Sequence, residues 1–200
     1  MRERSAGRVP TATLTGTALL LALGVALPLV FHAVPLGGRI FLPMHLPTFV
    51  AGLVLGPLAG LIVGAGSPMV SSLLTGMPVA PFYMVPMVFE LGTYGLVAGL
   101  LRPRLETMVG GSPAPAGLDT AGARRGGRPY AAVTLSLLGA MIAGRIVWMA
   151  VVVWLAPLVG LTARTAAMAI AAIGAGWIGM AVQLVLIPAI VRAIERVRGT

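Results

Sequence analysis

Two charged residues lie deep inside long apolar segments of this sequence, and they are its first candidates for chemistry. Glu90 lies 12 residues before Arg102, and Arg145 lies 15 residues after Tyr130. At 1.5 Å per helical residue, these spacings place them about 18 and 22 Å from the polar ends of their segments. A charge at that depth in a membrane is costly unless it is paired or hydrated, so both residues are functional candidates.

Two interpretations of Glu90 and Arg145 stay open. Their similar depths allow a structural ion pair that joins two helices. Alternatively, the planar guanidinium of Arg145 binds a carboxylate or phosphate of a substrate. The two interpretations coexist if the substrate enters the network.

Other polar and aromatic side chains accompany this pair. Tyr94 is one helical turn from Glu90, and Trp148 is one turn from Arg145. Polar anchors beside aromatic rings are typical of a ligand pocket. Gln183 adds an amide from the last apolar segment. The predicted substrate-binding residues are therefore Glu90, Tyr94, Arg145, Trp148, Gln183 and His45.

The composition places these residues in a membrane protein. Hydrophobic residues make up 58% of the 200 residues, charged residues 10%, and the mean hydropathy is +0.99. A soluble domain carries about 25% charged residues. Because the apolar runs are unbroken rather than alternating, they predict helices and not a barrel. The predicted class is an all-α, multi-pass membrane protein in contact with the lipid bilayer.

Positive charge decides the number of crossings. The apolar run 41–75 would form a helix of about 52 Å, whereas a bilayer core measures roughly 30 Å. Splitting it at Gly56-Pro57 gives two crossings and keeps the arginines of 102–128 cytoplasmic, together with those of both termini. We predict a single domain, 1–200, with both termini cytoplasmic and a flexible cytoplasmic linker at 103–129. Its six predicted helices lie near 11–34, 41–55, 57–75, 80–102, 130–156 and 164–194.

Small residues recur at a spacing of four on the first three of these segments. Ala18, Ala22 and Ala26 form a column on the first helix, where another backbone comes close, either a partner's or one within the bundle. A glycine column follows on the second and third helices. Because Pro57 interrupts this second column, we expect it to close a tight hairpin rather than form a dimer face; its members are Gly52, Gly56, Gly60 and Gly64.

Missing residue types exclude several functions. All 14 basic residues are arginine, and the chain contains no lysine and no cysteine. A P-loop needs its lysine, so this chain does not hydrolyse ATP through one. The two histidines lack metal-ligand spacing, and no nucleophile and base are spaced as in an enzyme. The net charge of +9 fits arginines that meet anionic lipid. We expect no cofactor, no metal and no nucleic-acid partner.

Four segments carry a familiar pattern: FLPMHLP at 41–47, AGLVLGP at 51–57, SSLLTGMP at 71–78 and FELGTYG at 89–95. They resemble the substrate-binding S components of energy-coupling factor (ECF) vitamin transporters, closely over the first four helices and mainly in topology over the last two. The resemblance implies an outer pocket capped by loops after helices one and three. It also implies that the Ala18–Ala22–Ala26 column faces a transmembrane coupling subunit (EcfT-like), with energy from two ATP-binding subunits, in a bacterial or archaeal plasma membrane.

The resemblance predicts a binding subunit for a water-soluble vitamin or vitamin precursor, not an enzyme. Arg145 favours an anionic ligand such as pantothenate or a related carboxylate. A cobalamin precursor and a pyrimidine stay open as alternatives. The alternative function is a stand-alone secondary transporter that couples to protons through Glu90.

Overall fold

The computed structural model describes residues 10–32, 42–79, 83–110, 128–158 and 176–198, and every regular element in these ranges is helical. Five of the helices are long and apolar enough to cross a membrane, which confirms the all-α membrane class. They are α1 (Thr11–His32), α4 (Pro57–Thr75), α5 (Met84–Gly110), α6 (Arg128–Leu158) and α8 (Trp177–Arg198).

The second predicted helix is shorter than a membrane crossing. It consists of α3 (His45–Val50) and the π-helix η1 (Ala51–Leu55), whereas the sequence suggested a start at residue 41. Leu42 has a positive φ of 47° and is followed by Pro43, so the helix does not extend further back. At 1.5 Å per residue the helix from His45 to Leu55 measures about 16 Å, roughly half of a bilayer core.

The predicted break between the second and third helices is present. Gly56 has a φ of 105°, a conformation that favours glycine, and ends η1. Pro57 then begins α4, where its missing N–H is not needed.

α5 is longer at its C-terminal end than predicted. It continues past Arg102 to Gly110, so the first residues of the expected linker 103–129 are helical. Pro103 lies inside the helix without ending it, and Arg102 Nε donates to Glu106 Oε1 at 2.7 Å across this turn. Residues 111–127 of the linker lie outside the described residues, as do 164–175 of the last predicted helix.

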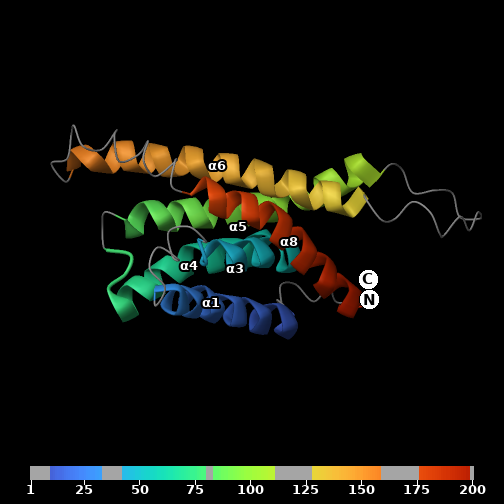
Figure 1. Ribbon diagram of the computed structural model, residues 1–200, viewed down its shortest axis with the longest axis horizontal. Coiled ribbons are helices and arrows are strands. Elements are labelled where there is room, and N and C mark those ends of the chain that lie inside the picture. The colour runs from blue at the N-terminus through green and yellow to red at the C-terminus, as the bar shows by residue number, and fades with distance from the viewer. Residues whose placement is uncertain (1–9, 33–41, 80–82, 111–127, 159–175, 199–200) are drawn as a thin grey trace, which may run out of the picture.

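α5 lies at the centre of the bundle (Figure 1). It packs against α6 on one side and against α4, α3 and η1 on the other. α1 packs on α4 and α3, and α8 contacts α6 and α3. The start of α1, the end of α5, the start of α6 and the end of α8 all lie at the same end, which we call the terminal end.

Glycines bring the α4 and α5 backbones into contact. A Cβ on Gly60 would overlap the carbonyl oxygen of Gly95, and one on Gly64 would overlap that of Leu91. Gly52 of η1 meets Gly95 in the same way. Gly52, Gly60 and Gly64 therefore pack inside the bundle, and Gly52 and Gly60 meet each other across the expected hairpin, whereas a Cβ on Gly56 would meet nothing within 4 Å.

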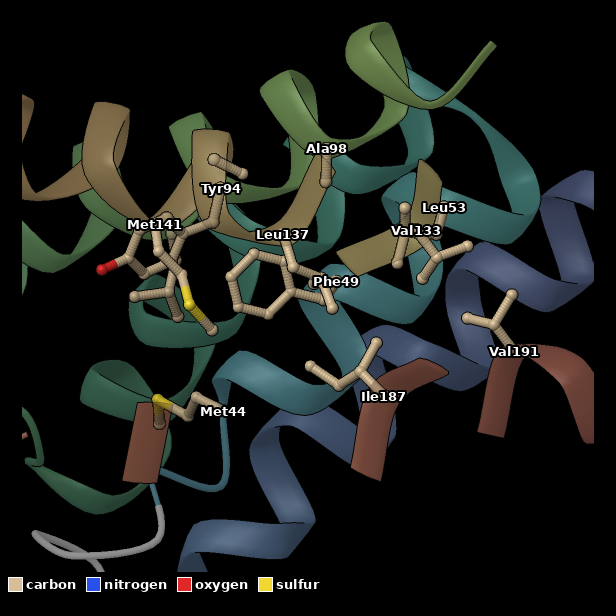
Figure 2. Packing of buried hydrophobic residues seen from close by; sticks show 12 residues of the cluster. Met44, Phe49, Leu53, Tyr94, Ala98, Val133, Leu137, Met141, Ile187 and Val191 are labelled. Carbon is tan, nitrogen blue, oxygen red and sulfur yellow. The ribbon is translucent and has the colours of Figure 1, made fainter. Parts of the chain in front are cut away.

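The core is a cluster of side chains from α3, η1, α5, α6 and α8 (Figure 2). Phe49 and Tyr94 stack there with their ring centroids 5.1 Å apart. Since lipid is as apolar as these side chains, close packing rather than escape from water holds the helices together. The other members are Met44, Leu53, Leu91, Ala98, Val133, Leu137, Ala140, Met141, Ile187 and Val191.

Candidate functional site

Glu90, Tyr94 and Arg145 form one polar group between α5 and α6. The Tyr94 hydroxyl donates to Glu90 Oε1 at 2.7 Å, and Arg145 Nη1 lies 3.2 Å from the same oxygen. Glu90 and Tyr94 are buried. Gly144 leaves room for the Tyr94 ring, because a Cβ at that position would overlap it. The ion pair that the sequence left open is therefore formed, with Tyr94 as its third member.

His45 and Gln183 extend this group to α3 and α8. The His45 ring packs against the Tyr94 ring, with centroids 5.3 Å apart. The Leu42 carbonyl oxygen accepts two hydrogen bonds, one from the His45 backbone N–H at 3.0 Å and one from Gln183 Nε2 at 3.3 Å. The structure thus brings five of the six predicted residues together: Glu90, Tyr94, Arg145, His45 and Gln183.

Leu42 is a part of this site that the sequence did not reveal. Its φ of 47° is unfavourable for a leucine, and such conformations are concentrated at functional sites. The conformation directs its carbonyl to two site residues, His45 and Gln183. The residue type carries no signal for this role, because the backbone rather than the side chain supplies the contact.

Trp148 is the predicted residue that packs elsewhere. It is buried on α6 and forms a small cluster with Val152, separate from the main core. A spacing of three residues places it near Arg145 on the helix surface but one turn further along the axis.

Four buried polar atoms in the described residues lack a hydrogen-bond partner, and all four belong to predicted site residues. They are both ring nitrogens of His45, Nε of Arg145 and Oε1 of Gln183. Buried polar atoms are nearly always bonded, and leaving one unbonded costs about 1–3 kcal/mol. Their grouping on three side chains of one polar network indicates a place where another molecule supplies the missing partners.

A second polar group joins three elements at the terminal end. Arg102 donates from Nη1 to the Leu53 carbonyl oxygen at 2.6 Å and pairs with Glu106 and Glu195. A cavity of about 480 Å³ lies beside it, lined in part by residues 52–57. None of the unpartnered buried atoms of the described residues lines this cavity, so the candidate site is the group around Glu90.

α1 presents a face that the described helices do not cover. Ala18, Ala22 and Ala26 are all exposed, and so are their neighbours Leu19 and Leu23. The alanine column therefore does not pack within the described part of the bundle. In a membrane this face contacts either lipid or another protein.

Comparison with protein families assigns the chain. The family model for the substrate-specific component of ECF transporters matches residues 12–194. The chain belongs to this family. No match was found among curated proteins or among solved structures. S components are binding subunits of transporters rather than enzymes, and they work in general with EcfT and ATPase subunits. This S component is accordingly a multi-pass membrane protein, as its five long apolar helices also indicate.

Proposed function

We propose that this S component is the ligand-binding subunit of an ECF-type ABC importer for a water-soluble vitamin or vitamin precursor. The unpartnered polar atoms of His45, Arg145 and Gln183 carry the proposal, because a bound molecule would satisfy them. Glu90 and Tyr94 hold Arg145 and His45 in place through the ion pair and the ring contact. The site draws on four elements, α3, α5, α6 and α8, as a pocket between helices does.

The proposal includes an orientation in which both termini are cytoplasmic and the chain crosses the membrane six times in one domain. Seven arginines lie in the described residues, and all except Arg145 belong to helix ends at the terminal end of the bundle. The positive-inside rule supports a cytoplasmic location for that end. The short helix His45–Leu55 and α4 then form a hairpin whose first arm begins within the bilayer of the cell membrane.

The exposed alanine column of α1 is the proposed contact for the EcfT-like coupling subunit. Ala18, Ala22 and Ala26 lack bulk, so a partner helix can approach the α1 backbone closely. Two ATP-binding subunits would supply the energy, which agrees with a chain that has no lysine for a P-loop.

Ala22→Trp tests whether partner contact and ligand binding use separate surfaces of the protein. The indole would block the partner helix, and position 22 lies on α1, which contributes none of the candidate site residues. Binding of the small molecule that co-purifies with the protein should stay at the wild-type level, whereas its ATP-dependent uptake by the assembled transporter should be lost. Ile142→Trp is the matched control, because Ile142 is an exposed residue of α6, far from α1 in the bundle, and should retain both activities. Full uptake by Ala22→Trp would contradict the assignment of the column, and loss of binding would indicate a structural role.

The alternative function, proton-coupled transport through Glu90, receives less support from the geometry. The Glu90 carboxylate accepts a hydrogen bond from the Tyr94 hydroxyl and is paired with Arg145, so two contacts fix its position between α5 and α6. We therefore assign Glu90 a positioning role.

A further inference from the structure

The candidate site is electrically balanced before any ligand binds. Its charged members are the carboxylate of Glu90 and the guanidinium of Arg145, whose Oε1 and Nη1 atoms lie 3.2 Å apart. Both side chains are largely shielded, with exposed fractions of 5% and 17%. The other arginines and glutamates of the described residues belong to the terminal end: Arg102, Arg104, Glu106, Arg128, Arg192, Glu195, Arg196 and Arg198.

This balance restricts the charge of the ligand. A carboxylate or phosphate would give the buried site a net negative charge, which is strongly unfavourable at this depth in a membrane. If the anion instead displaced Glu90 from Arg145, Glu90 would keep its hydrogen bond from the Tyr94 hydroxyl but lose its positively charged partner. An uncharged ligand leaves the pair intact and avoids both costs.

The unpartnered atoms define the polar edge of that ligand. Arg145 Nε can only donate, so the ligand must present an acceptor, and Gln183 Oε1 can only accept, so it must also present an N–H or O–H. A neutral imidazole offers one donor and one acceptor. Both His45 nitrogens are buried without a partner in the described residues, so they offer two more contacts to a ligand.

We infer that the site takes an uncharged compound that carries both a hydrogen-bond acceptor and an N–H or O–H donor, as an amide, a lactam or a cyclic urea does. The inference rests on the proposed function and deepens it by naming the class of substrate. It replaces the anionic ligand that Arg145 by itself suggested, because Arg145 is already neutralised by Glu90. Gln183 Oε1 then accepts a hydrogen bond from the ligand, and Arg145 Nε donates one. Glu90 neutralises the charge of Arg145.

Native mass spectrometry of the full chain purified in detergent tests this inference, with the bound molecule identified after release. We expect a compound that is uncharged at pH 7 and carries an N–H or O–H as well as an acceptor. In Gln183→Met, loss of the acceptor should lower the bound fraction about tenfold, the effect of one lost hydrogen bond. Ser136→Ala is the matched control: Ser136 is also buried, but its hydroxyl is bonded to the Ala132 carbonyl, so the bound fraction should not change.

Two matched probe pairs make the charge test independent of any variant. Thermal shifts of the wild-type protein are compared for nicotinamide and nicotinate, and for pantothenol and pantothenate. Each uncharged probe should stabilise the protein at least as much as its carboxylate counterpart. A larger shift from a carboxylate would overturn the inference.

The outcomes separate the inference from the proposed function. An anionic compound that is lost in Gln183→Met would overturn the uncharged class and leave the ligand site standing. A compound that Gln183→Met retains in full, or a wild-type protein with no bound compound, would overturn the ligand site itself and with it the proposed function.

Discussion

Arg145→Met tests whether the buried ion pair holds α5 to α6. Methionine keeps an unbranched side chain on the helix but removes the group that lies 3.2 Å from Glu90 Oε1. Glu90 would retain the Tyr94 hydroxyl at 2.7 Å without an opposite charge. Removing one partner of a buried pair costs about 3–5 kcal/mol, which for a chain of this size lowers Tm by on the order of 10 °C.

Thermal denaturation in detergent measures this loss. Adding Glu90→Gln to Arg145→Met removes the unpaired charge and should recover most of the stability, which gives the coupling energy of the pair. Arg104→Met is the control, because Arg104 is an exposed arginine of α5 and its removal should change Tm little. If Arg145→Met melts at the wild-type temperature, or if the double variant is no more stable than the single one, the pair does not stabilise the bundle.

Two further predictions concern packing away from the site. Gly95→Ala should lower Tm strongly, because its Cβ would overlap the Gly60 backbone. Gly139→Ala is the control and should be tolerated, because its Cβ would meet only the end of a flexible leucine side chain. Equal Tm values for the two variants would refute the contact between Gly95 and Gly60. Arg102→Met should cost about 2 kcal/mol in urea denaturation, because the Leu53 carbonyl, Glu106 and Glu195 all lose their contact with the guanidinium, and an unchanged midpoint would show that these contacts add no stability.

The sequence predicted those features that depend on depth and helical spacing. Arg145 and Glu90 could be matched because both lie near mid-membrane, where a charge needs a partner. Tyr94 could be added because one helical turn separates it from Glu90. The break at Gly56-Pro57 was equally visible, because these two residue types restrict the backbone in a known way.

Features that depend on tertiary contacts were not predictable. Leu42 has a positive φ that directs its carbonyl to His45 and Gln183, and nothing in a leucine signals this. The helix α5 continues through Pro103 to Gly110, although proline and glycine in the following residues indicated a linker. Trp148 had the right spacing but packs with Val152, since spacing along one helix does not identify the neighbour it meets.

Under the proposed function, this chain binds a solute and depends on partner subunits for energy. Uptake into proteoliposomes measures this dependence, with the co-purifying compound supplied in radiolabelled form. The chain alone should accumulate none of it under an imposed proton gradient, whereas the chain with the coupling subunit and both ATP-binding subunits should accumulate it when ATP is present inside. Accumulation by the chain alone that follows the proton gradient and disappears in Glu90→Gln would contradict the claim and favour a proton-coupled transporter.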